Sequence, residues 1–433
     1  MLSAIRRSNL PSALRVFVTC SATIGTNRQA ILRMQAEAAQ QQRSSRPTHN
    51  VRVLHVVASA GRYGAEAVIA ALSREQHALG LHVHVAIISD NLTATAPYAE
   101  ELKQQCHAEV TVVEGRGLRD LFLTNRIAEI ATQAGATIIH SHGYKSDILC
   151  SRVELPNVRR ISTLHGWTTV RPWSRMALYQ SLQVRALRRF DAVVAVHESV
   201  WRQHHGLRAV SNQMCIANGI PELDCASPSD GHFAWLPESH PPLVLVVGRI
   251  SQEKGQLLAI EALMELKRRG VDVLLVCAGD GPQMPILRAS VTRNELSSRV
   301  LLPGYIQKIA ALLNHATVLL IPSSTEGMPM ILLEAMRSGV PVVASAVGGM
   351  ASVLGYGRAG RLVSPGSSMQ IADAISDLLD CPTERAAMKR EGQLRFADHY
   401  SSRVMAHHYQ QAYEKLLVFS MTQPAAIVAV GAK

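Results

Sequence analysis

Aromatic residues are scarce in this sequence: Phe, Trp and Tyr together make up 4% of its 433 residues. A surface that stacks nucleic-acid bases needs such side chains, so their scarcity counts against a nucleic-acid-binding protein. No apolar run reaches the roughly 18 residues that a membrane span requires. Apolar residues still make up 47% of the chain and charged residues 18%, which is typical of a globular protein with an ample core. At ~150 residues a domain, we expect two or three domains.

Closely spaced cysteines are also absent. The seven cysteines are odd in number and widely separated, and no C-x-x-C occurs. This pattern supports neither a disulfide framework nor a zinc site, and it fits reduced thiols in a cytoplasm. The cysteines are Cys20, Cys106, Cys150, Cys215, Cys225, Cys277 and Cys381.

Acidic residues are nearly missing from residues 1–50, which contain one, Glu37, among many Arg, Ser and Gln. This composition resembles a mitochondrial transit peptide. A wrongly assigned start codon, with Met34 as the true start, and a solvated basic tail are the alternatives. We expect this extension to be disordered. The whole chain carries a net charge of +11, which favours anionic partners such as phosphates, although charge alone is a weak guide.

From residue 51 onward, short β-branched runs alternate with helical segments. Val51–Ser59 reads as a buried strand, Gly61–Glu66 as a glycine loop, and the next segment as an amphipathic helix that stops at Gly80. Such alternation predicts a parallel sheet covered on both faces. We assign residues 51–220 to this domain, with further strands in 82–89, 109–115, 137–143, 159–166 and 191–199.

Five prolines fall within residues 221–242, which we interpret as a linker between domains. The alternation then restarts in residues 243–390. The fold class predicted is therefore α/β, with two Rossmann-like doubly wound parallel-sheet domains that face a cleft. Residues 391–417 read as a final helix and residues 418–433 as a loose tail.

Two loops at strand ends carry the residues for chemistry, where open parallel sheets bind their ligands. The first is GRISQEKG, Gly248–Gly255. Gly248 allows a tight turn, and Arg249 and Lys254 lie beside a helix start, whose free N–H groups already favour an anion. Two cations and a helix end suit a diphosphate, although a solvated loop would explain the pair alone equally well.

The second loop is STEGMPMILLEAMRSGVP, Ser324–Pro341. Pro329 fits the first position of a helix, which places Glu326 in the loop and Glu334 within the helix. The amides of Gly327, Met328, Met330 and Ile331 are expected to be free at the helix start. A carboxylate among them should stay ionised and accept hydrogen bonds from sugar or ribose hydroxyls. A lone Glu334 would more often decorate a helix surface.

Together with AGDGP, Ala278–Pro282, these two loops resemble the retaining glycosyltransferases of family 4, which have the GT-B fold. The resemblance runs from about Val51 to Leu417. It implies that the final helix crosses back onto the first domain and that Gly64 of the glycine loop faces the donor diphosphate. It also implies that His165 lies near the donor sugar, that Glu326 contacts that sugar and that Glu334 binds the ribose.

The predicted site follows from these motifs and the resemblance. The catalytic residues are Glu326, His165, Arg249 and Lys254. The donor-binding residues are Gly64, Gly248, Arg249, Lys254, Asp280, Gly281, Glu326, Gly327, Met328, Met330, Ile331 and Glu334. Pro221, Ser352 and Ser367 stand where the family commonly has acids, which bears on the choice of donor rather than on the reaction class.

The resemblance implies retention at the anomeric carbon by front-face attack, with the leaving diphosphate helping to take the acceptor proton. No acid-rich metal cluster or DxD-like triplet is visible in the sequence. We therefore expect no metal and no cofactor, with Arg249, Lys254 and the helix end in place of an ion.

Two other signals are weaker. GYGRAG, Gly355–Gly360, matches a dinucleotide pattern but follows no strand and precedes one instead of a helix. His82 with His84, and His140 with His142, form H-x-H pairs that could bind zinc, yet the sequence places no third ligand beside them. We expect packed or surface histidines, and His142 could line the cleft.

The segment Arg171–Phe190 has five arginines, no acid and several apolar residues. A basic amphipathic face of this kind can lie on an anionic membrane, and an ordinary solvated helix is the alternative. The expected partners are a nucleotide sugar and a saccharide or lipid-linked acceptor, in polysaccharide or cell-envelope biosynthesis, in the cytoplasm or at the inner face of the membrane. A catalytically silent partner protein and a sugar-nucleotide epimerase are the competing functions.

Overall fold

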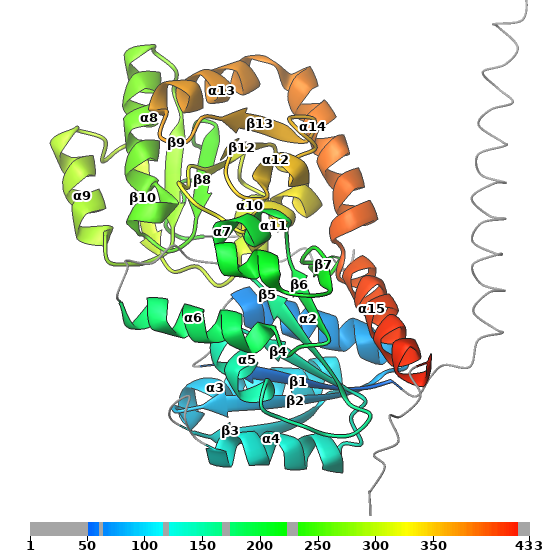
Figure 1. Ribbon diagram of the computed structural model, residues 1–433. Coiled ribbons are helices and arrows are strands. Elements are labelled where there is room, and N and C mark those ends of the chain that lie inside the picture. Colours follow the sequence, from blue (N-terminus) through cyan, green and yellow to red (C-terminus); the bar gives the residue numbers. More distant parts are fainter. Residues whose placement is uncertain (1–50, 60–63, 116–120, 167–173, 223–232, 423–433) are drawn as a thin grey trace, which may run out of the picture. The chain divides into compact units, whose positions relative to one another are not determined.

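A computed structural model describes residues 51–59, 64–115, 121–166, 174–222 and 233–422 (Figure 1). Within them lie two sheets whose strands all pair in parallel. The first has the order β3-β2-β1-β4-β5-β6-β7, and the second has the order β10-β9-β8-β11-β12-β13. In both, the strand order reverses direction beside the first strand, which is the point where doubly wound sheets bind ligands. The predicted fold class is confirmed.

The first domain is built around the first sheet. Its strands are β1 (Arg52–Ala58), β2 (His82–Ser89), β3 (Glu109–Glu114), β4 (Ile138–His142), β5 (Arg159–Leu164), β6 (Ala192–Ala195) and β7 (Gln213–Cys215). Its helices are α2 (Gly64–Ala78), α3 (Leu92–Cys106), α4 (Leu121–Gln133), α5 (Tyr144–Cys150), α6 (Arg175–Leu187) and α7 (Ser199–Gln203), followed by the 3-10 turn η1 (His205–Ala209).

The second domain is built around the second sheet. Its strands are β8 (Leu243–Val247), β9 (Leu274–Ala278), β10 (Val300–Gly304), β11 (Val318–Ile321), β12 (Val342–Ser345) and β13 (Gly360–Val363). Its helical segments are η2 (Gln252–Lys254), α8 (Gln256–Arg268), α9 (Met284–Arg293), α10 (Ile309–Leu313), α11 (Met330–Ser338), α12 (Met350–Val353), α13 (Ser368–Asp380) and α14 (Pro382–Arg395).

Alternate residues of each strand enter two different cores. In β1, Val53 and Val57 pack with residues of α2 and α3, whereas Leu54 and Val56 pack on the other face with residues of α4. The second sheet is covered on both faces in the same way. Since both faces are buried, the strands read as continuous apolar runs in the sequence.

The chain ends its second domain and returns to the first (Figure 1). After α14 comes one π-helical turn, Phe396–Tyr400, and then α15 (Ser402–Thr422) packs against α2. Its apolar stripe includes Met405, Tyr409 and Tyr413, which are buried with β1 and α2 in one core. The final helix therefore crosses back onto the first domain, as the family resemblance implied.

Three expectations about elements were wrong. The helix expected over residues 391–417 is broken, because α14 ends at Arg395 and α15 begins at Ser402. Pro329 occupies the N-cap of α11 with an extended backbone, so Met330 is the first helical residue. The short edge strand β7 was missed. In contrast, Gly355–Gly360 leads into β13, which confirms that it is not a dinucleotide loop.

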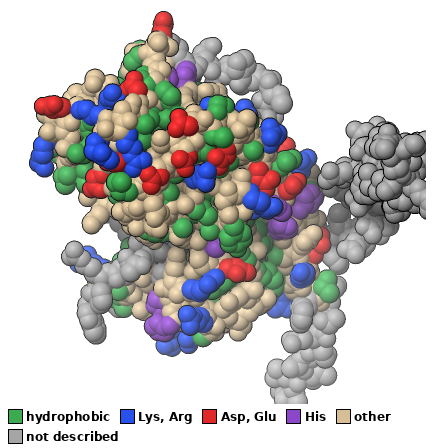
Figure 2. Space-filling view, turned by 90° about the horizontal axis from the view of Figure 1, so that it is seen from above, with side chains coloured by type: hydrophobic (Ala, Val, Ile, Leu, Met, Phe, Trp, Pro, Cys, Tyr) green, Lys and Arg blue, Asp and Glu red, His purple; other side chains and the backbone are tan. Residues whose placement is uncertain are grey.

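Charge is mixed on the face shown in Figure 2, where basic and acidic side chains lie next to each other. Residues 1–50 carry seven arginines and one glutamate, a net +6 of the chain's +11, and the remaining residues carry +5. More than half of the excess that suggested an anionic partner therefore belongs to the extension and not to the two domains. The extension itself lies outside the described residues.

Candidate active site

A cavity of about 1010 Å³ lies between the two domains, at the carboxyl ends of the central strands. Gly64 and Arg74 of α2 line it from the first domain, and the loops after β8, β9 and β10 line it from the second. A cavity of this size suits a small-molecule substrate. Of the predicted donor-binding residues, it is lined by Gly64, Gly248, Arg249, Asp280, Met330 and Glu334, and the other six lie behind or beside it.

The cationic loop follows β8 as the sequence predicted. Gly248 has a φ of +146°, and a Cβ on the neighbouring Gly279 would lie 1.9 Å from the Gly248 carbonyl oxygen, so the two strand ends approach as only glycines allow. Arg249 is exposed and lines the cavity. Its carbonyl oxygen accepts a hydrogen bond of 3.0 Å from the Gln256 side chain, at the start of α8. The guanidinium thus projects from a loop that is held at both ends.

Lys254 and Glu326 form an ion pair deep in the loop region. Lys254 Nζ lies 2.6 Å from Glu326 Oε1, and the Ser323 hydroxyl donates to the same oxygen at 2.7 Å. The Glu326 side chain is 9% exposed and that of Lys254 is 30% exposed. The pair joins two loops, separated by 72 residues, that follow adjacent strands β8 and β11. The pair brings together Lys254, which was expected to bind the donor diphosphate, and Glu326, which was expected to contact the donor sugar.

Free backbone amides gather at the start of α11. Among the described residues, the N–H groups of Gly327, Met328, Met330 and Ile331 donate no hydrogen bond to another part of the protein. Helix starts of this kind attract anions. The Met328 side chain is buried in the core of the second domain, so only its backbone can serve a ligand.

Glu334 lies one turn further along α11 and lines the cavity. Burial raises the pKa of Glu334, and the nearby Arg337 guanidinium opposes that shift. Arg337 is itself held in place, because its Nη1 donates to the Pro221 carbonyl oxygen at 2.6 Å. Glu334 is thus a half-buried acid that lines the cavity, and not a solvated residue on an exposed helix face.

The first domain contributes Gly64 and His165. A Cβ on Gly64 would lie 3.9 Å from Met330 Cγ, so this glycine comes close to the start of α11, and both residues line the cavity. A Cβ on Gly327 would lie 3.4 Å from the His165 carbonyl oxygen. Burial lowers the pKa of His165 to about 4, and the Asn218 side chain opposes this shift without reaching the geometry of a full hydrogen bond. His165 is therefore a neutral imidazole beside the Glu326 loop.

Asp280 and Gly281 form the remaining predicted contact. The Asp280 carboxylate accepts a hydrogen bond of 2.8 Å from the Gly281 backbone, and a Cβ on Gly281 would lie 2.3 Å from the Ile250 carbonyl oxygen. Asp280 lines the cavity, whereas Gly281 supports the loop behind Arg249.

Sequence reasoning missed three residues at this site. Tyr305 follows β10, lines the cavity and is 80% exposed. Ser323 shares Glu326 with Lys254. His197, which follows β6, has its Nε2 2.8 Å from the Ser352 hydroxyl, and this hydrogen bond joins the two domains. Ser352 stands at a position where the family commonly has an acid. Tyr305 could have been found as an aromatic residue at the carboxyl end of the apolar run Val300–Gly304.

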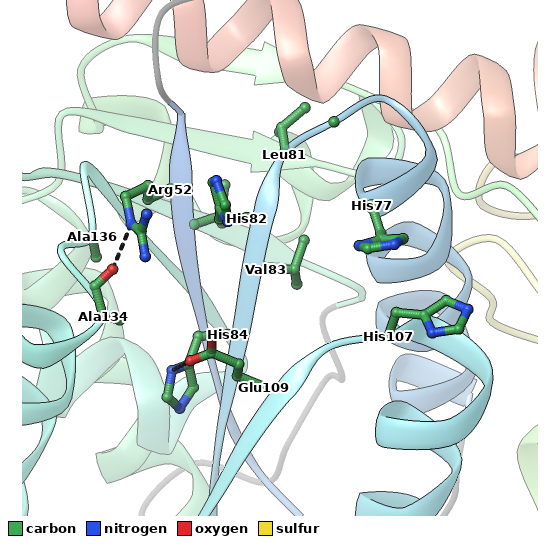
Figure 3. Close-up of a pocket in the computed structure, with 12 residues that line it drawn as sticks. Arg52, His77, Leu81, His82, Val83, His84, His107, Glu109, Ala134 and Ala136 are labelled. Atoms are coloured by element: carbon green, nitrogen blue, oxygen red, sulfur yellow. Dashed lines mark hydrogen bonds and ion pairs between the residues drawn. The ribbon is translucent and has the colours of Figure 1, made fainter.

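Two smaller cavities lie in the first domain. One, of about 200 Å³, is at the carboxyl ends of β1, β2 and β4, where Asp90, His142, Tyr144 and Lys145 line it. The other, of about 210 Å³, lies at the amino ends of β1 and β2 (Figure 3). Arg52 and His84 in this second cavity already bond to Ala134 and Glu109. Because the strands are parallel, this second cavity lies at the end of the sheet opposite to the candidate active site.

The sequence placed no third ligand beside the H-x-H pair of β4, but the structure places a third histidine there. His55 of β1 lies directly opposite His140 in the sheet, and ring nitrogens of His55, His140 and His142 all lie within 4.8 Å of one another. The sequence could not show this, because the register between β1 and β4 joins residues 85 positions apart. Of the two alternatives expected for this pair, packed or surface histidines, the structure shows the packed one, because both rings are buried.

Two family models match the chain. Residues 63–222 match Glycosyltransferase Family 4, and residues 230–395 match Glycosyl transferases group 1. The 2-deoxystreptamine glucosyltransferase of Streptomyces kanamyceticus is 33% identical over 186 residues, which is 42% of this chain and 48% of that protein. The N-acetyl-alpha-D-glucosaminyl L-malate synthase of Bacillus anthracis is 24% identical over 315 residues, 69% of this chain and 80% of that one. The chain thus spans about half the length of the first of these relatives.

Solved structures show the same fold. Anabaena HepE in complex with UDP superposes with a TM-score of 0.70 at 19% identity, over 84% of this chain and 100% of that one. Sucrose-phosphate synthase from Thermosynechococcus elongatus gives 0.69 at 21% identity, over 85% and 100%. With two matched models, two doubly wound domains and these neighbours, the chain belongs to the family 4 glycosyltransferases of the GT-B fold.

Proposed function

We propose that the protein transfers a sugar, with retention of its anomeric configuration, from a nucleotide-diphosphate sugar to a saccharide or lipid-linked acceptor. The observation that carries this proposal is the convergence of Arg249 and Glu334 on the interdomain cavity, with the Lys254–Glu326 ion pair and the free amides of α11 in the loops beside it. Cations and amides aimed at a diphosphate stabilise the charge that develops on a leaving group. The HepE structure of the same fold was solved in complex with UDP, which supports a nucleotide as the ligand of this chain.

The donor is proposed to lie along the second domain. The diphosphate contacts Arg249, Lys254 and the start of α11, and the sugar lies between Glu326 and His165. Glu334 accepts hydrogen bonds from the ribose, for which a carboxylate made more basic by burial is well suited. The exposed ring of Tyr305 offers an apolar face to the nucleotide base.

The chemistry follows from charge and position. The acceptor hydroxyl attacks from the face that the diphosphate leaves, and a diphosphate oxygen takes its proton. Positioning and charge stabilisation are what the protein supplies. The two cations and the helix start take the place of a metal ion, so we propose a metal-independent reaction.

The acceptor is proposed to enter from the first domain. The 200 Å³ cavity beside His142 opens at the carboxyl ends of the strands and offers Asp90 and Lys145 as polar groups. Such a mixture suits the hydroxyls of a saccharide. A role in polysaccharide or cell-envelope biosynthesis, in the cytoplasm, is the biological setting we propose.

Hydrolysis of a panel of UDP-, GDP- and ADP-sugars tests the reaction. We expect slow cleavage of one donor by the wild type. Lys254→Ala and Glu326→Gln should each lose on the order of 100- to 1,000-fold, since removal of one charge-stabilising group costs roughly 3–4 kcal/mol. Lys267→Ala and Glu129→Gln, which change exposed residues away from the cavity, are the matched controls. Full turnover in both site variants would contradict the proposal, and an epimerised product would favour the epimerase.

Peripheral membrane contact is proposed through α6. Within the described residues, no helix combines the length and apolarity needed to cross a bilayer. On α6, however, Met176, Leu178 and Leu182 are 40%, 59% and 40% exposed, and Arg185 and Arg188 are exposed on the same helix and its end. Residues 171–173 of the predicted segment lie outside the described residues. Exposed apolar and basic side chains together are typical of a surface that lies on anionic lipid.

Flotation with vesicles that contain anionic lipid tests this contact. We expect binding that weakens with salt and is lost when Arg185, Arg188 and Arg189 are changed to Glu. The same charge change at Lys267, Arg268 and Arg293, on the second domain, should have little effect. Binding that neither salt nor the α6 variant changes would count against it.

A further inference from the structure

Four histidines of the first domain lie together behind the candidate site. His55 lies on β1, His140 and His142 lie on β4, and His165 follows β5. His55 and His140 are 0% exposed and His142 is 4% exposed. Buried polar side chains must find partners, so the way these rings pair is informative.

Three of the rings form one hydrogen-bonded line. Gln76 Oε1 of α2 lies 2.8 Å from His55 Nε2, His55 Nδ1 lies 3.0 Å from His142 Nε2, and His142 Nδ1 lies 3.1 Å from His165 Nε2. A branch runs from the same Gln76. Its Nε2 donates to the Tyr413 hydroxyl at 3.1 Å, and that hydroxyl lies 2.7 Å from His140 Nδ1. The branch ends with His140 Nε2 at 2.7 Å from the Thr163 hydroxyl.

Each hydrogen bond in this network holds one proton. This leaves two possible arrangements of the protons on the ring nitrogens. A neutral imidazole carries a proton on one nitrogen and a lone pair on the other. With the Gln76 carbonyl oxygen toward His55, the proton of His55 must be on Nε2, and His142 and His165 must follow with theirs on Nε2. The branch gives His140 the same tautomer. If the Gln76 amide were turned over, all four protons would move to Nδ1.

All four rings are neutral, as both proton arrangements require. Burial lowers the pKa of His55 and His165 to about 4, and it lowers the pKa of His140 and His142 well below the usual value. In addition, the neighbouring histidines disfavour a second charge on His140 and His142.

The relay of Gln76, His55 and His142 uses the Nε2 of His165. Its Nδ1 is buried beside the Asn218 side chain and makes no hydrogen bond in this structure, so among the four rings it is the nitrogen left for a further partner. We propose that these three are positioning residues that hold His165 neutral, with its lone pair on Nδ1, so that it accepts a hydrogen bond from a hydroxyl of the donor sugar. The role of His165 toward the donor sugar rests on the proposed function. The arrangement of protons on the four rings does not depend on that function.

A metal ion is the competing use of these rings. Three ring nitrogens lie within 4.8 Å of one another, but an ion among them would have to replace the bond between His55 and His142. The cluster holds no carboxylate to balance a divalent charge in this buried place. The geometry therefore favours protons over a metal.

Nitrogen NMR of the full chain labelled in its histidines tests the proton order without an activity assay. We expect His55, His140, His142 and His165 to be neutral with the proton on Nε2 at neutral pH. Protons on Nδ1, mixed tautomers or an imidazolium would overturn the proposal. So would a stoichiometric metal in the purified protein whose removal by a chelator changes these signals.

Kinetics of two variants on α2 test the effect on the reaction. Gln76→Met keeps the volume but removes both hydrogen bonds, so we expect mixed tautomers at His165 and a kcat lower by about tenfold, with the donor KM unchanged. Gln76→Glu should restore kcat, since a protonated carboxyl accepts from His55 and donates to Tyr413 as the amide does. Ser73→Ala, one turn earlier and equally buried, is the control.

Equal losses in Gln76→Met and Ser73→Ala would show a structural role only and overturn the positioning role. An unchanged kcat in Gln76→Met would do the same. If the wild type cleaves no nucleotide sugar, the proposed function fails, while the NMR result still decides the proton order.

Discussion

At the scale of single residues, Lys254 and Glu326 neutralise each other in this structure at 2.6 Å. A donor diphosphate would therefore compete with Glu326 for the lysine. In the reaction that we propose, this exchange would free the carboxylate for the sugar when the phosphates bind. Two residues that the sequence assigned to separate tasks thus act as one unit, and their single variants should not be additive.

Asp147 is a buried acid that the proposed reaction does not use. Its carboxylate accepts hydrogen bonds from Ser141 at 2.5 Å, Ser162 at 2.7 Å and Gln183 at 2.7 Å. Burial raises the pKa of Asp147 to about 6, against the influence of these three donors. A raised folded pKa stabilises the fold below pH ~4, and this contribution is lost as the pH rises through about 6.

Asp147→Asn should therefore stabilise the fold above pH 6. The gain is up to roughly 3 kcal/mol in the free energy of unfolding at pH 7 and falls toward zero near pH 4. Gln183 can turn its amide to accept from the new NH₂ group. Urea unfolding at several pH values measures the difference from wild type. A variant less stable at pH 7 would contradict the raised pKa, and Asp191→Asn, which loses an ion pair with Arg159, should be destabilised throughout.

Residues at strand ends could be predicted from sequence because a parallel sheet brings its carboxyl ends together. Arg249, Glu326 and Glu334 were found in this way. His55 and Gln76 were not, since a histidine within a strand and a glutamine on a buried helix give no local signal. Only the register of β1 with β4 brings His55 to the H-x-H pair, and only the packing of α2 on the sheet brings Gln76 to His55.

At the scale of elements, the chain crosses between the domains twice at one place. The Ile220 N–H donates to the Tyr400 carbonyl oxygen at 3.0 Å, and the Ser402 N–H donates to the Ile220 carbonyl oxygen at 2.8 Å. The break between α14 and α15 lies here. Ser401 accepts from the Val404 N–H, which is an N-cap that the sequence could have revealed.

Gly219→Ala tests how tightly the two crossings pack. The new Cβ would lie 2.5 Å from the Ser401 carbonyl oxygen, so backbone must move. We expect a loss of roughly 1–3 kcal/mol in the free energy of unfolding and lower donor turnover. Gly392→Ala is the control, because its Cβ meets Met336 at an ordinary 3.7 Å within α14, and it should gain roughly 0.5–1 kcal/mol. Equal stability of Gly219→Ala and wild type would contradict the close crossing.

Element types were largely predictable from sequence, whereas element ends were less so. Continuous apolar runs between glycine and proline signals identified nearly every strand of both sheets. Pro329 was misplaced by one residue because proline fits the N-cap and the first helical position almost equally well. β7 was missed, since a three-residue edge strand with two exposed residues carries no apolar pattern.

At the scale of the whole molecule, the neutral histidines make the first domain sensitive to acid. The unfolded chain protonates its histidines below pH 6.5, whereas His55, His140, His142 and His165 stay neutral in the fold. Their lowered pKa therefore contributes stability that is present above pH 6.5 and is lost as the pH falls toward about 4.

We expect the free energy of unfolding to fall by up to roughly 5 kcal/mol per pH unit below pH 6.5, or about 1.4 kcal/mol for each ring. The raised pKa of Asp147 opposes this loss of stability by about 1.4 kcal/mol per pH unit, the contribution of one group. Denaturant unfolding between pH 7.5 and 5 measures the slope. A flat profile over this range would mean that the rings bind protons in the folded state, which would contradict the neutral network.

The proposed function depends above all on where a nucleotide binds. An experimental structure with a nucleoside diphosphate or its sugar provides the most direct test. We predict that the diphosphate contacts Arg249, Lys254 and the start of α11, with the ribose against Glu334. A nucleotide bound elsewhere, such as in the histidine-lined cavity of Figure 3, with Lys254 still paired to Glu326, would contradict it.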